Sequence, residues 1–293
     1  MKKIHNAFVI GLSALLVAAS GCGAHAPASS DTGSSEIGGT PSVPQTASSS
    51  PASAPGTGSG AADPESSGDS SGDSAAPSQA QQATPDQIRA ALNTKVPAVL
   101  PADVPVEEGR YWTATTASQT ASYRVNFYET AQPAKINSQA AAKGTPIATV
   151  EGTEYRDAAG AKESISGYEQ VDFSNYGTLV DLGHKIKAVG DAGLGHQYLI
   201  WNEGRWCLRI DSPIDPAFRN KKYPDGEQLA KAVVAYLEDH MLPAPQKIGV
   251  ISISIWNQND GTNVEWQEDR TVYRVASKDP MTALKTAVAM KLK

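Results

Sequence analysis

Between Gly23 and Pro85 the chain has no aromatic residue, no lysine and no arginine. Serine, alanine, glycine, proline and threonine make up most of this stretch, and the composition changes abruptly near Thr84. Such a segment cannot bury enough apolar surface to offset the entropy lost on ordering. The sequence therefore predicts a disordered tether over residues 22–83 and a single globular domain over residues 84–293.

No bilayer-length apolar run follows the positively charged start of the chain. The run from Ala7 to Ala19 has 13 residues, whereas a membrane-spanning helix takes ~20. This length is typical of a signal peptide. The run ends in Ala19-Ser20-Gly21-Cys22, which resembles the processing box of bacterial lipoproteins, with Ala19 in place of the usual leucine.

The resemblance to the processing box implies that residues 1–21 are a signal peptide and that Cys22 carries a thioether-linked lipid. The membrane would then be a partner of the protein through that lipid, on the extracytoplasmic face of the cell membrane. Two or more acyl chains anchor a protein stably, whereas one does so only marginally. The alternative is an ordinary signal peptide with an incidental cysteine.

Cysteine is scarce, because Cys22 and Cys207 are the two in the chain. If Cys22 is lipidated, Cys207 has no partner for an intramolecular disulfide. One interpretation makes Cys207 a small buried hydrophobic residue. The other places it on one strand face with Arg205 and Arg209, whose charges would lower its pKa and favour redox or nucleophilic chemistry.

Excess positive charge is also missing. The domain holds 23 basic and 25 acidic residues, so it is close to neutral. A nucleic-acid-binding domain would show a basic patch or stripe. The sequence therefore predicts no nucleic-acid partner and no basic surface for anionic lipids.

Catalytic and metal-binding motifs are absent from residues 84–293, which contain no HExxH, CxxC, P-loop or GxSxG pattern. We therefore expect no metal, no cofactor and a protein that is more plausibly a binding module than an enzyme. His184 and His196 lie on consecutive predicted strands, near Asp172, Asp181 and Asp191 in sequence. They are candidates for a metal site or an acid–base pair, and hydrogen-bonded structural histidines are the alternative.

Local patterns predict the fold class. Helices are expected after Thr84, Asp225 and Asp279, which are N-cap residues, and over residues 157–165. Strands are expected where apolar and polar residues alternate; they cover residues 111–116, 123–128, 147–150, 185–189, 196–201, 205–211, 248–256, 264–266 and 271–275. Short turns join most of them, and strands and helices do not alternate. The prediction is an α+β domain, with a mostly antiparallel, curved sheet and three to four packed helices.

One hairpin provides a candidate binding surface. If Asn202-Glu203-Gly204 is a three-residue loop, Trp201 lies opposite Arg205, and Arg209 lies further along the same strand. Trp and Arg are enriched among binding hot spots, so Trp201, Arg205 and Arg209 form the candidate surface. The alternative is that Trp201 is a core residue.

Four segments resemble uncharacterised surface lipoproteins of Gram-positive bacteria. They are residues 111–116, 126–130, 195–198 and 201–206. The resemblance brings no catalytic residues. Because catalytic motifs are missing and aromatic residues are concentrated on hairpins, we expect a membrane-anchored extracytoplasmic module that binds a cell-wall or protein partner. Two alternatives remain open, namely a hydrolase with a carboxylate site and a lipid or lipoprotein carrier with an apolar cavity.

Overall fold

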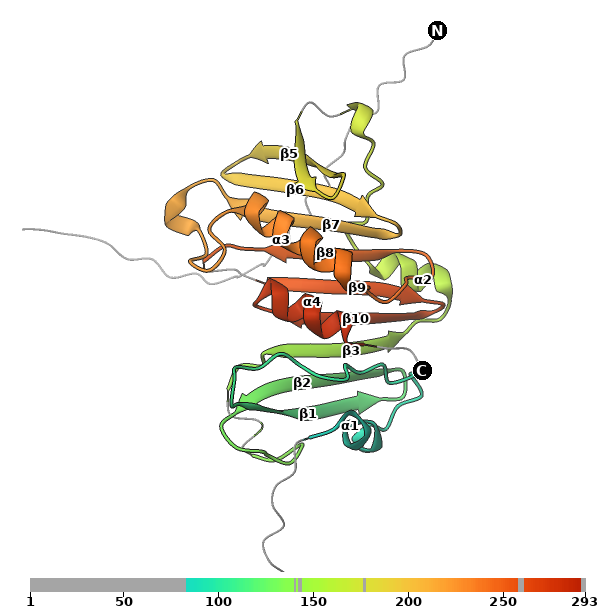
Figure 1. Cartoon of the computed structure of the whole chain (residues 1–293). Coiled ribbons are helices and arrows are strands. Elements are labelled where there is room, and N and C mark those ends of the chain that lie inside the picture. The colour runs from blue at the N-terminus through green and yellow to red at the C-terminus, as the bar shows by residue number, and fades with distance from the viewer. Residues whose placement is uncertain (1–82, 140, 142–143, 176–177, 258–260, 291–293) are drawn as a thin grey trace, which may run out of the picture. The chain divides into compact units, whose positions relative to one another are not determined.

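Ten strands form one sheet in the computed structural model (Figure 1), which describes residues 83–293 except 140, 142–143, 176–177, 258–260 and 291–293. The predicted signal peptide, Cys22 and all of the predicted tether but its last residue lie outside the described residues. The strands are β1 (Tyr111–Gln119), β2 (Ser122–Thr130), β3 (Ala148–Glu154), β4 (Leu179–Gly183), β5 (Ile186–Gly193), β6 (His196–Glu203), β7 (Trp206–Pro213), β8 (Gly249–Ser254), β9 (Gly261–Glu268) and β10 (Thr271–Ser277).

The strand order across the sheet is β1-β2-β3-β10-β9-β8-β7-β6-β5-β4. All neighbours are antiparallel except β7 and β8, which are parallel. The expected α+β class with a mostly antiparallel sheet is confirmed. This parallel pair needs a long crossover, which the absence of strand–helix alternation in the sequence did not indicate. Here the connection from β7 to β8 carries α3 (Gly226–Asp239).

Within the described residues, four α-helices pack on the sheet, and each begins after a residue whose side chain caps it. Thr84 completes a capping box for α1 (Pro85–Ala91), and Asp157 accepts the Gly160 N–H ahead of α2 (Ala158–Ser164). Asp225 caps α3, and Asp279 caps α4 (Pro280–Val288). Each oxygen satisfies a backbone N–H that has no partner inside the helix, which is why these starts could be predicted.

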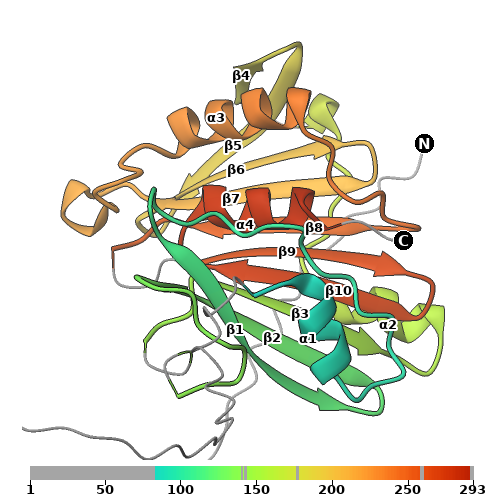
Figure 2. The same ribbon diagram turned by 60° about the horizontal axis from the view of Figure 1, so that its bottom comes forward.

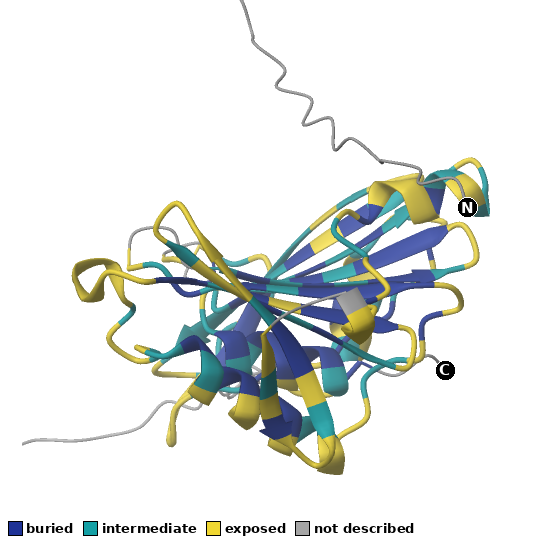
Figure 3. Cartoon of the chain, turned by 90° about the horizontal axis from the view of Figure 1, so that it is seen from above, coloured by how far each residue is buried: buried dark blue, intermediate teal, exposed yellow. Residues whose placement is uncertain are grey.

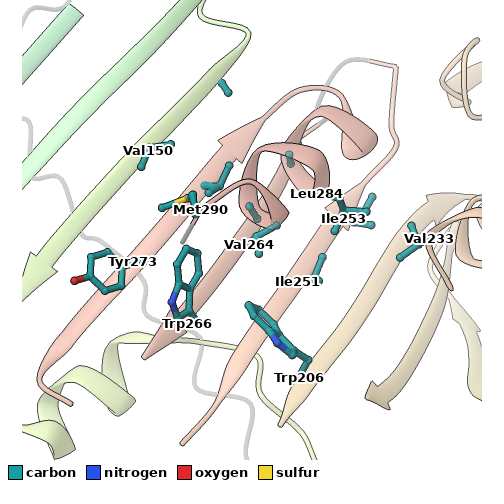
Figure 4. Packing of buried hydrophobic residues seen from close by; sticks show 14 of the residues in the cluster. Val150, Trp206, Val233, Ile251, Ile253, Val264, Trp266, Tyr273, Leu284 and Met290 are labelled. Carbon is teal, nitrogen blue, oxygen red and sulfur yellow. The ribbon is translucent and has the colours of Figure 1, made fainter. Parts of the chain in front are cut away.

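One face of the sheet carries the main hydrophobic core. Helices α1, α3 and α4 lie on this face (Figure 2), and the extended segment between α1 and β1 adds buried Val96, Val99 and Val104. In the centre, Trp206, Trp266 and Tyr273 line up along neighbouring strands beside α4 (Figure 4). Alternate strand residues point into this core because side chains alternate between faces with a period of two.

The opposite face has less apolar cover. Helix α2 buries a second, small cluster around Cys207, Val250 and Val272. These residues alternate with core residues such as Leu208 and Ile251, so the cluster lies on the other side of the sheet. We call this side the open face; α3 and α4 lie in front of the sheet in Figure 1, so the open face is turned away from the viewer.

Candidate functional site

Two rows of side chains on the open face surround a hollow of about 510 Å³. Strand pairing defines both rows, since residues opposite one another across a sheet share a face. The first row runs from β5 to β9 through Val189, Ile200, Arg209, Ser252 and Asn263. The second runs in parallel through Asp191, Tyr198, Asp211, Ser254 and Gly261. Together with Glu169 from the segment after α2, these rows line what we call the open-face pocket.

The floor of the pocket is apolar at one end and polar at the other. Val189 is buried and Ile200 is half-buried, whereas Ser252 and Asn263 supply a hydroxyl and an amide. The Asn263 carbonyl oxygen accepts the Nε–H of Arg274 at 2.9 Å. That bond leaves the amide nitrogen of Asn263 as the group able to donate elsewhere.

A cluster of three rings stands at one end of the pocket. His196 stacks on Tyr198 with ring centroids 5.4 Å apart and planes 7° apart, and it lies 4.5 Å from the Trp256 ring. His196 Nδ1 is 2.8 Å from Asp211 Oδ1, and Trp256 Nε1 donates to the same oxygen at 3.2 Å. Asp211 therefore fixes both rings, and its second oxygen accepts no hydrogen bond from the described residues.

The pKa of the Tyr198 hydroxyl reflects the charges that surround the pocket. Its side chain is 38% exposed, and desolvation raises the pKa of its hydroxyl. Nearby Asp211 and Asp191 raise the pKa further, while Arg209 lowers it. The hydroxyl thus lies in a region where negative charge exceeds positive charge, although Arg209 is near.

A ladder of alternating charges occupies the open face beside the pocket. The ladder crosses four adjacent strands, and each residue lies directly opposite the next. Its members are Arg124 on β2, Glu151 on β3, Arg274 on β10 and Glu265 on β9. Glu151 pairs with both arginines, and burial raises the pKa of Glu265 against the pull of Arg274. The two arginines balance the two glutamates, so this half of the face has no net charge from the ladder.

Of the three residues predicted from the sequence to form a binding surface, two are exposed and one is buried. Trp201 is fully buried in the main core, and its Nε1 donates to Glu203 Oε1 at 2.8 Å. Arg205 and Arg209 are exposed. Arg209 lines the open-face pocket and donates to the Gly167 carbonyl at 3.2 Å, whereas Arg205 donates to the Gln246 carbonyl at 3.1 Å.

The predicted pairing of Trp201 with Arg205 is wrong. Glu203 pairs with Trp206, so Gly204-Arg205 is a two-residue turn and Trp201 lies opposite Leu208. Gly204 has a φ of +59°, the conformation that two-residue hairpin turns require and glycine adopts easily. The expected loop begins two residues before the observed turn, so every expected partner is displaced by three residues and Trp201 was paired with Arg205 instead of Leu208.

The structure also places the two histidines and Cys207, for each of which the sequence left two interpretations. His184 lies in the β4–β5 turn, 3.6 Å from Glu238, and the structure does not join it to His196. His196 pairs with Asp211, which sequence reasoning missed; the signal was that His196 and Tyr198 share one face of a strand whose hairpin partner carries Asp211. Cys207 is buried, and burial raises the pKa of its thiol despite Arg209. The interpretation of Cys207 as a small buried hydrophobic residue is therefore confirmed, and the lowered pKa that the redox alternative requires is contradicted.

A second hollow, of about 360 Å³, lies between the β6–β7 turn and the end of α3. Its lining is more apolar and includes Trp206, Leu237, Leu242 and Pro243. Within the described ranges, no group of three or more histidine, cysteine, aspartate or glutamate side chains is arranged to hold a metal ion. None of the helices in that part of the chain combines the length and apolarity that crossing a bilayer requires.

Comparison with known proteins adds no relative: no family model matches the chain, and neither curated proteins nor solved structures show a significant match.

Proposed function

We propose that this protein is a lipoprotein, anchored through Cys22 to the extracytoplasmic face of the cell membrane, whose folded domain binds a ligand without transforming it. The observation that carries the binding role is the open-face pocket, about 510 Å³ in volume and lined by side chains from β5 to β9. Small-molecule sites typically occupy ~300–1,000 Å³. The near-neutral domain also supports a partner other than nucleic acid, in the cell wall or on another protein.

Support for a binding role also comes from how the polar groups are held. Asp211 is engaged by His196 and Trp256, and Arg209 is engaged by the Gly167 carbonyl. Groups fixed in this way lose little freedom when a ligand arrives, which favours binding. We further propose that the sheet curves toward its open face and so deepens the pocket.

The anchor is tested by fractionating cells that express the full chain. Cys22→Ser should abolish lipidation and leave the protein unprocessed or released from membranes. Cys207→Ser is the matched control, because it removes the other cysteine and should leave the protein in the membrane fraction. A mature-length Cys22→Ser chain that stays with membranes would contradict the anchor.

The binding role is tested by NMR titration of the full chain with a mixture of saccharides, amines, carboxylic acids and short peptides. Shift changes should concentrate on the two rows that line the open-face pocket. Ser252→Trp, which fills the floor, should suppress them, and Thr115→Trp, on the same face but on β1, should not. Changes that are scattered, or that survive Ser252→Trp, would refute the role.

A further inference from the structure

The open-face pocket presents hydrogen-bond donors and acceptors side by side. The Ser252 hydroxyl can do both, the Asn263 amide nitrogen can donate, and the second oxygen of Asp211 can accept. A ligand that carries only acceptors would give Asp211 no hydrogen-bond donor, and one that carries only donors would give the Asn263 amide nitrogen no acceptor. Hydroxyl groups can bond to both residues, because each hydroxyl is a donor and an acceptor.

The end wall of the pocket is an aromatic ring with one covered face. His196 precedes Tyr198 by two residues on the same strand face and stacks on its ring. Tyr198 also lines the pocket and is 38% exposed, so the part of the ring that His196 leaves uncovered is accessible to a ligand. An aromatic face is electron-rich, so it suits the C–H bonds on the flat side of a sugar ring.

Charge and polarity exclude other ligand classes. Asp191 and Asp211 outnumber Arg209 in the lining, so an anionic ligand would be repelled. A wholly apolar ligand would strip water from Ser252, Asn263 and Asp211 without replacing its hydrogen bonds, which is unfavourable. Neutral polyhydroxylated molecules avoid both penalties.

We infer that the open-face pocket binds a neutral saccharide, with one sugar ring against the exposed part of the Tyr198 ring and its hydroxyl groups bonded to Asp211, Ser252 and Asn263. This inference rests on the proposed binding function and names its ligand class. A saccharide is a constituent expected at the cell envelope, where the anchor would hold the domain.

Calorimetric titration of the full chain with chitotriose, cellotriose and maltotriose tests the inference, with inorganic phosphate and spermidine as contrasting probes. At least one saccharide should bind, and phosphate should not. Tyr198→Ala should weaken saccharide binding by about tenfold or more, which corresponds to about 1.4 kcal/mol, while Tyr198→Phe should bind nearly as the parent does. The matched control is Tyr128→Ala, which removes a tyrosine from β2 outside the pocket.

The possible results distinguish a failure of the saccharide inference from a failure of the proposed binding function. If spermidine or phosphate binds in the pocket and the three saccharides do not, the saccharide inference is overturned and the binding function stands. If no probe or library member binds there, both fail. If a saccharide binds equally well to the Tyr198→Ala and parent chains, the stacking geometry is wrong and the inference is overturned.

Discussion

Replacing Trp201 with alanine should lower the free energy of unfolding by about 4–5 kcal/mol. Trp201 is 0% exposed, and truncating a buried tryptophan typically costs ~3–5 kcal/mol. The variant also loses the Nε1–H bond to Glu203, a carboxyl group whose pKa is raised by burial. Losing one partner of a buried hydrogen bond costs about 1–3 kcal/mol, so the total should lie near the upper end of the cavity range.

The test is urea or thermal unfolding of the full chain, followed by circular dichroism. The midpoint temperature should fall by roughly 8–20 °C, because each kcal/mol shifts a domain of this size by roughly 2–4 °C. Trp201→Phe, which keeps an aromatic ring and removes the N–H, should lose only about 1–3 kcal/mol. A Trp201→Ala chain within ~1 kcal/mol of the parent would refute the core placement and revive a surface role for this residue.

Two further predictions concern single residues. Leu194 is 102% exposed and has a φ of +53°, a conformation that costs most L-residues about 1–2 kcal/mol; Leu194→Asn should therefore stabilise the chain by about 0.5–1 kcal/mol. Leu179→Asn, at an exposed strand position without positive φ, should not stabilise in the same thermal unfolding assay, and a gain as large there would contradict the strain argument. Cys207 should react with iodoacetamide far more slowly in native protein at neutral pH than in urea, since it is buried and its thiol pKa is raised; equal rates in mass spectrometry would refute this.

Much of the secondary structure could be predicted because its signals are local. Thr84, Asp157, Asp225 and Asp279 each sit one residue before a helix and bind its first free N–H groups. The alternation of Tyr123, Val125 and Phe127 likewise showed which side of β2 is buried. Such patterns need no knowledge of distant residues.

What could not be predicted depends on distant partners. Strand β4 is short and mostly exposed, so Leu179–Gly183 carries little alternation. The parallel pairing of β7 with β8 depends on a crossover, and one crossover among many hairpins leaves no repeating pattern. Pairing of β3 with β10 joins segments far apart in the chain.

The candidate site could not be predicted from the sequence for a more specific reason. The sequence assigned both Tyr198 and Asp211 to strands, but whether they pair across the hairpin depends on the position of the turn. With Gly204-Arg205 as the turn, Tyr198 faces Asp211; with the longer loop that the sequence suggested, it faced Leu208. The pocket also takes residues from β8 and β9, which no local signal links to the β6–β7 hairpin.

The pairing of Glu154 with Thr271 has a consequence for synthesis. When β1, β2 and β3 have left the ribosome, the far edge of β3 has no partner until β10 appears near the end of the chain. Open strand edges are templates for pairing with other molecules, and contacts between remote segments form slowly. A chain truncated before Thr271 would expose the edges of β3 and β9 in addition to those of β1 and β4, so the last strand to be made is also the one that covers these two edges.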